Sequence, residues 1–294
     1  MNLLFAAAGV GLAVHWSGGE LRRFERLAAE DIRSKLHGDA RQVSVRAEMK
    51  GPLGGLFGEV RRVTIRARSF STDGLPLFTE PERSKRGRVQ DLRIVLDDFT
   101  LRGLRIEHLE ASIPSCRFDL GLALSRKQIR LSRSGVGTGR VRILESDLEQ
   151  FVLRKYREIK RVRVRVDRHH VFVEGYGEFL VIQTNFFVIA KLAPVGGNKL
   201  ELTDAKVFFD DRRADEASKR AVLDTLNPVV DLNADLKLFG AIQLEGVRLV
   251  EGVLEAWGKT RIPERPPEPS PPFPSSRESG RGMLYPSLPH APSP

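Results

Sequence analysis

The chain has 294 residues, of which 41% are apolar, and it carries a formal net charge of +10. This length suffices for one or two domains with a sizeable core, and the apolar share excludes wholesale disorder. The single cysteine, Cys116, excludes an internal disulfide.

The chain begins with an apolar run of twelve residues, at positions 3–14. This run is too short to span a bilayer, which needs about 20 residues, but it has the length of a signal-peptide core. No Lys or Arg precedes it, so the basic start of a signal peptide is missing. Residues 1–19 are interpreted as an export or anchoring segment, with a short apolar helix docked on the body as the alternative.

Residues 20–36 have the pattern of an amphipathic helix, because apolar residues recur at spacings of three and four. After Gly38 the period changes to two, which predicts a strand over residues 43–49. A glycine-rich loop follows at residues 51–58. Similar alternation predicts further strands at residues 63–67, 92–96, 104–109, 118–124 and 141–143.

A second helix is expected at Ser146-Asp147-Leu148-Glu149, because Ser146 and Glu149 have the spacing of a capping box. Alternating valines then predict a hairpin at residues 162–173. Residues 179–192 form a more continuously apolar strand, which suggests cover on both faces. The remaining expected elements are a strand at 200–209, a helix at 214–225 and short strands at 241–244, 247–250 and 253–257.

This order of elements lacks the regular alternation of strand and crossover helix that a doubly wound parallel sheet requires. It predicts an α+β fold in which a long antiparallel sheet wraps around one or two long helices, within a domain at residues 20–259. Eleven of the seventeen prolines fall after that domain. Residues 260–294 are therefore interpreted as a disordered tail rich in Pro and Ser.

The sequence shows no motif that is typical of a catalytic or metal-binding site. The six histidines have neither cysteine partners nor an H-E-x-x-H pattern. Residues 135–139 are glycine-rich but lack the Lys-Ser/Thr of a phosphate loop, and are interpreted as a turn. No Gly-x-Ser-x-Gly motif is present. We therefore expect no enzyme activity, no cofactor and no bound metal.

The positive charge is concentrated in residues 126–168, which hold fourteen Lys or Arg against five Asp or Glu. This surplus predicts an anionic partner, and the low aromatic content of 7% argues against nucleic acid. On a strand, Arg161, Arg163 and Arg165 share one face. We expect a basic face that docks on anionic lipid, with an ordinary solvated face as the alternative. Its expected members are Arg140, Arg142, Lys160, Arg161, Arg163 and Arg165.

Four stretches resemble the LmeA-like phospholipid-binding proteins of bacteria. They are the opening helix with its glycine-rich loop, the strand at 60–67, the helix start at 143–148, and the closing region at 227–254. The resemblance spans about residues 20–259. It implies a strongly curved antiparallel sheet wrapped on a helix, similar to tubular lipid-binding folds, and phospholipid binding at the cell envelope.

The combined prediction is a non-catalytic phospholipid-binding or lipid-transfer protein at a bacterial membrane. An apolar groove would hold acyl chains, with Phe24, Ala28, Ile32 and Phe151 as its expected residues. The alternatives are a scaffold protein with a filled core, and a nucleic-acid binder that uses residues 126–168. The expected location is the cell envelope or a membrane, by export or an N-terminal anchor, with a peripheral cytoplasmic protein as the alternative.

Overall fold

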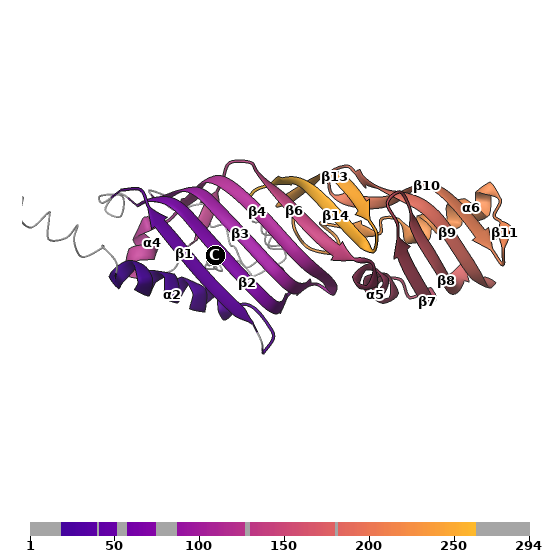
Figure 1. Ribbon diagram of the computed structural model, residues 1–294, viewed down its shortest axis with the longest axis horizontal. Helices are drawn as coiled ribbons and strands as arrows, with labels where there is room; N and C mark the ends of the chain where they lie inside the picture. The colour runs from indigo at the N-terminus through magenta and orange to yellow at the C-terminus, as the bar shows by residue number, and fades with distance from the viewer. Residues whose placement is uncertain are drawn as a thin grey trace, which may run out of the picture.

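The structure, a computed structural model, describes residues 19–39, 41–51, 58–74, 87–126, 130–179 and 182–262. The molecule is elongated, and its two β-sheets follow one another along the long axis (Figure 1). The expected export segment before Gly19 and the expected tail after Ile262 lie outside the described residues.

The first sheet has the strand order β1-β2-β3-β4-β6-β14-β13, and the short β5 pairs with β4. Its strands are β1 (Gln42–Met49), β2 (Glu59–Thr72), β3 (Gly87–Leu101), β4 (Leu104–Phe118), β5 (Leu131–Arg133), β6 (Gly137–Leu144), β13 (Ile242–Val250) and β14 (Val253–Thr260). The second sheet has the order β11-β10-β9-β8-β7, and β12 pairs with β10. Its strands are β7 (Ile159–Val166), β8 (Val171–Phe179), β9 (Ile182–Val195), β10 (Lys199–Phe209), β11 (Arg212–Arg213) and β12 (Val230–Asp231).

The described ranges contain four helices of 6 to 15 residues, and both sheets are open. The helices are α2 (Gly19–Arg33), α4 (Leu120–Ser125), α5 (Glu145–Lys155) and α6 (Glu216–Leu226). Antiparallel pairing dominates, as predicted. The sequence interpretation missed one parallel pair, β2 with β3, while the other strand pairs of the described ranges are antiparallel.

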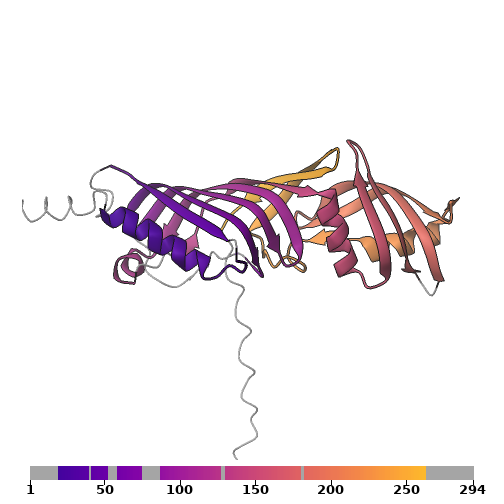
Figure 2. The ribbon, with the colours of Figure 1, turned by 60° about the horizontal axis from the view of Figure 1, so that its bottom comes forward.

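Strands β2, β3 and β4 depart from strict alternation at the same two levels of the first sheet. At one level the inward side chains step by three residues instead of two: Ala67 to Phe70, Leu96 to Phe99 and Ile106 to Leu109. Ser69 and Asp98 drop out of the pairing there, with φ angles of 55° and 48°. The second level has the steps Val60 to Val63, Val89 to Leu92 and Ile113 to Cys116. A residue that drops out of the strand pairing bends its strand. Because such residues lie at the same level in neighbouring strands, they curve the whole sheet (Figure 2).

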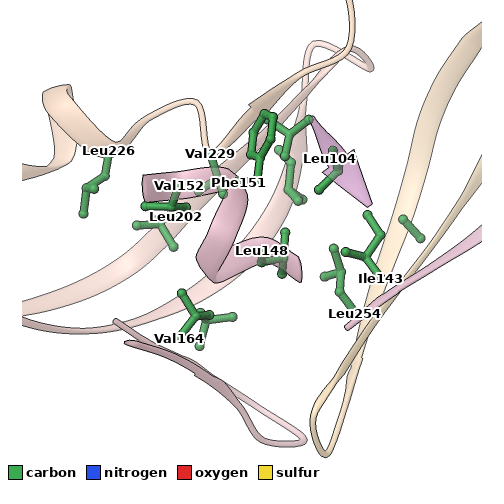
Figure 3. Close-up of a cluster of buried hydrophobic side chains, with 14 of the residues drawn as sticks. Leu104, Ile143, Leu148, Phe151, Val152, Val164, Leu202, Leu226, Val229 and Leu254 are labelled. Carbon is green, nitrogen blue, oxygen red and sulfur yellow. The ribbon is translucent and has the colours of Figure 1, made fainter. Parts of the chain in front are cut away.

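Helix α5 lies at the junction of the two sheets. Its Leu148, Phe151 and Val152 are buried, and Figure 3 shows them between residues of both sheets. The residues around them are Leu104, Ile143 and Leu254 from the first sheet and Val164 and Leu202 from the second. A single hydrophobic cluster therefore runs through both sheets and holds them together.

The start of α5 differs from the expected capping box. The helix begins at Glu145 after Leu144, which makes no side-chain cap, and the backbone N–H of Val164 donates to Glu149 Oε2 at 3.0 Å. The N–H of Val166 donates to Glu145 Oε2 at 2.8 Å. Strand β7 is the edge of its sheet and needs acceptors for its outward N–H groups. The capping-box prediction is wrong, because the Glu149 carboxylate accepts a hydrogen bond from the backbone of β7 and not from the start of the helix.

Replacement of Glu149 with alanine is expected to lower the free energy of unfolding by about 1–3 kcal/mol, because the Val164 N–H loses its charged acceptor. The matched control is Ser146→Ala at the residue expected to cap. Since Ser146 is exposed and makes no cap, its loss should change stability by less than about 0.5 kcal/mol. Chemical denaturation measures both. If both variants lost the same free energy of unfolding, the result would support a capping box between Ser146 and Glu149.

Candidate functional site

An apolar cavity of about 140 Å³ lies against the inner face of the first sheet. Much of its wall consists of inward side chains from five strands: Phe70 of β2, Leu96 and Phe99 of β3, Leu109 and Ala111 of β4, Val141 of β6 and Ala256 of β14. The rings of Phe70 and Phe99 stack with centroids 5.1 Å apart. A wall of hydrocarbon without buried charge suits an apolar ligand, since an unpaired charge there would lose its hydration.

Residues 230–241, called the strap below, contribute another part of the cavity wall. Leu236 and Leu238 are buried and line the cavity, whereas Lys237 and Phe239 are exposed. Leu232 is the third leucine of the strap on the wall. The sequence interpretation included this segment in the closing region of the family resemblance, at 227–254, but gave it no part in the groove. The alternation of leucines with polar residues was the available signal, but it does not say which face of the protein the segment covers.

The base of the strap is fixed to the end of α5. Lys155 Nζ donates to Asp235 Oδ2 at 2.7 Å and to the carbonyl oxygen of Pro228 at 2.6 Å. The Tyr156 hydroxyl lies 2.9 Å and 2.7 Å from the carbonyl oxygens of Leu226 and Pro228. Burial raises the pKa of Tyr156, so the hydroxyl stays a neutral donor. These bonds tie one wall of the cavity to the helix that joins the sheets.

Polar groups at the cavity are few. Thr72 and Thr260 are buried in the wall. Glu110, Arg140 and Trp257 also border the cavity, but they alternate with inward residues of their strands, so their side chains point to the outer face of the sheet. The hydroxyls of the two threonines and the exposed Arg261 after β14 are therefore the polar groups that can orient a head group at the rim.

Reactive groups elsewhere in the molecule offer little chemistry. Burial raises the pKa of Cys116 to about 12, so its thiol stays protonated and is a poor nucleophile. Among the described residues there is no cluster of three or more His, Cys, Asp or Glu that could hold a metal ion.

The four residues expected in the groove lie in different places. Ile32 lines the cavity. Phe24 and Ala28, also on α2, pack in a separate hydrophobic cluster against the first sheet, and Phe151 lies in the junction at α5. Phe24, Ala28 and Phe151 are not among the residues of the cavity wall. Their contact with lipid stays a prediction.

The six residues expected in the basic face divide between the two sheets. Arg140 and Arg142 lie on β6, and Arg140 is exposed on the outer face of the first sheet. The guanidinium of Arg142 lies 3.6 Å from a carboxylate oxygen of Glu107 and 3.5 Å from one of Glu255. A hydrogen bond from Arg248, together with the charges of Arg248, Arg142 and Arg140, lowers the pKa of Glu255. Carboxylates thus offset much of the charge on the first sheet.

The other four residues of the predicted basic face lie on β7. Arg161, Arg163 and Arg165 are exposed and alternate with buried valines, as the sequence predicted, and Lys160 is also exposed. The three arginines form no ion pair with any residue that the structure describes. Their charge is therefore available to an external anion. Arg140 and Arg142 belong to the other sheet, so the six residues do not form one face.

None of the helices in the described part of the chain has both the length and the apolar character needed to cross a bilayer. A family model for LmeA-like phospholipid-binding proteins matches residues 85–256. The match contains the last two of the four stretches that carried the resemblance, while the first two precede it. No match was found among curated proteins or among solved structures.

Proposed function

Since the chain belongs to the LmeA-like phospholipid-binding family, we propose that it is a non-catalytic protein that binds phospholipid in the apolar cavity at a membrane or cell envelope. The cavity against the inner face of the first sheet is the observation that carries this proposal. Acyl carbons lie along Phe70, Leu96 and Phe99, and the head group stays at the rim near Arg261.

The size and lining of the cavity support hydrocarbon binding. An engineered apolar cavity of about 150 Å³ stays dry and binds benzene, so a lined space of similar volume accepts part of an acyl chain. Each buried CH₂ contributes about 0.8 kcal/mol. The rest of the acyl chain requires the strap to shift away from the sheet. Hydrogen bonds hold the strap to Lys155 at Asp235 and to Arg261 at Gly240 and Ala241, so this shift breaks bonds at one of these places.

The proposal extends to how the lipid is reached. The arginines of β7 meet anionic head groups, and the curved first sheet with α2 acts as the lipid-holding body, in the manner of a tubular lipid-binding fold. A protein of this design moves lipid between a membrane and an acceptor, or presents it to an enzyme of the envelope.

The test is native mass spectrometry of the full chain purified without detergent, followed by solvent extraction of bound lipid. The variant Ala111→Leu with Ala256→Leu fills the cavity from two strands. We expect it to lose most of the bound phospholipid while its stability changes by less than about 1 kcal/mol, because the void accepts the added carbons.

The matched control is Ala190→Leu. Ala190 is fully buried in the second sheet and does not line the cavity. Leucine there overpacks a filled core and should cost about 1–3 kcal/mol, with lipid retained by the folded fraction. A wild-type chain that carries no lipid and takes up none from vesicles would refute the proposal and favour the alternative of a scaffold protein.

A further inference from the structure

The outer face of the second sheet carries a row of phenylalanines. Phe172 of β8, Phe187 of β9 and Phe208 of β10 alternate with buried residues and therefore point away from the core. Their ring centroids are 6.3 Å apart from Phe172 to Phe187 and 6.1 Å from Phe187 to Phe208. These three residues are called the aromatic row below. Each ring is half-buried, in contact with the next ring of the row.

Basic side chains border the aromatic row. The Arg165 guanidinium lies over the ring of Phe172 at 5.1 Å, and that of Arg161 lies over the ring of Tyr176 at 5.3 Å. Lys206 is exposed on the same face of β10. The aromatic row thus lies beside the guanidinium groups of Arg161 and Arg165, and neither group forms an ion pair with a described carboxylate.

The helices of this half leave the aromatic row uncovered. Buried Leu148 and Val152 of α5 and Val222 of α6 belong to the cluster that contains the inward residues Val188 and Val207. Both helices therefore pack on the inner face, and among the described elements none lies over the outer face. Adjacent apolar side chains that form one continuous patch at a solvated face mark a contact surface more often than isolated ones do.

The outer face of the first sheet carries both paired and unpaired arginines. Arg61 pairs with Glu48, whereas Arg66 and Arg68 are exposed and form no ion pair with a described residue. The large exposed aromatic residue of this face, Trp257, lies over Gly246 of the neighbouring strand. The difference between the two outer faces is therefore the row of adjacent aromatic rings on the second sheet.

We infer that the aromatic row and the arginines of β7 form the surface by which the protein docks on an anionic phospholipid bilayer. This inference rests on the proposed function. Aromatic rings settle at the boundary between acyl chains and head groups, and the flanking guanidinium groups reach the phosphates. Charge complementarity selects an anionic membrane as the occupant, since the row alone would fit any apolar surface.

Vesicle flotation of the full chain tests the inference, with vesicles of phosphatidylcholine alone and of equal parts phosphatidylcholine and phosphatidylglycerol. The variant F172S/F187S/F208S is expected to lose on the order of tenfold or more in binding to the anionic vesicles, because three rings no longer enter the interface. Unchanged binding by a variant that unfolds at the wild-type temperature would overturn the inference. So would loss of a dimer with vesicle binding intact, which would make the row a protein interface.

A second measurement does not depend on the stability of that variant. In a W16F/W257F background, F187W places a fluorophore in the row, and vesicles with brominated acyl chains quench it only if the row enters the bilayer. The matched control is the W16F chain, in which Trp257 reports on the outer face of the first sheet and should not be quenched. Absence of quenching in bound F187W protein would overturn the inference.

The lipid extracted from the purified chain tests the proposed lipid site in the cavity separately from the docking surface. Row-dependent flotation of a chain that carries no lipid would refute the proposed lipid site while leaving the docking surface in place. If the chain retains lipid but floats equally well without the three phenylalanines, the docking surface is refuted and the proposed lipid site stands.

Discussion

Replacement of Arg161, Arg163 and Arg165 with glutamine is expected to weaken binding to anionic vesicles on the order of 100-fold at low ionic strength. Each basic residue near an anionic surface contributes about 1 kcal/mol, and about 1.4 kcal/mol is a tenfold change in affinity. The three side chains are exposed, so their loss should not change the fold. Flotation at increasing salt should erase the difference, because screening weakens the attraction of the wild-type chain.

Single substitutions provide the matched comparison. Arg163→Gln removes an arginine without an ion pair to a described residue, and should weaken binding about fivefold. Arg142→Gln removes an arginine that lies between Glu107 and Glu255, so it should change binding much less. If Arg142→Gln were as damaging as Arg163→Gln, the basic residues of the first sheet would belong to the docking face.

Replacement of Phe151 with alanine is expected to lower the free energy of unfolding by about 3–5 kcal/mol, because it opens a void at the junction of the two sheets. Phe151 is 5% exposed and lies in the cluster that runs through both sheets (Figure 3). Urea denaturation measures the loss. A separate transition for each sheet would appear if the junction no longer couples them.

Phe151→Leu is the matched control, since it keeps most of the buried hydrocarbon and should cost clearly less than Phe151→Ala. Because Phe151 does not line the cavity, the folded Phe151→Leu protein should retain its lipid. Lost lipid with unchanged stability would place Phe151 in the lipid groove, as the sequence interpretation expected.

The features with a strong local period could be predicted from the sequence. The alternation in β7 correctly places its arginines outside and its valines inside, and the helix expected at 214–225 forms as α6. These two predictions succeed because the side-chain period depends on neighbours in the chain. The family assignment is also confirmed for residues 85–256.

Features that depend on distant partners could not be predicted. The three-residue steps in β2, β3 and β4 are visible as breaks in alternation, but only their alignment across strands shows that they bend the sheet. Glu149 was assigned to a helix start because its true partner, the Val164 N–H, becomes a neighbour only after β7 packs beside α5. The apolar run at 179–192 suggested cover on both faces, whereas Phe187 lies on a face that no described helix covers.

The candidate site was only partly predictable for the same reason. Ile32 was predicted from the helical period and lines the cavity, but the period cannot separate cavity wall from filled core, as Phe24 and Ala28 demonstrate. The strap joins the site through contacts between residues far apart in sequence, such as Lys155 with Asp235.

Photo-crosslinking with a phosphatidylglycerol whose acyl chain bears a diazirine reports most directly on where the lipid lies. The account predicts that labelled peptides come from β3, β4 and the strap, at positions around Leu96, Leu109 and Leu236, and that the label disappears in the A111L/A256L protein. Label confined to the outer faces of the sheets, with none on the cavity wall, would contradict it.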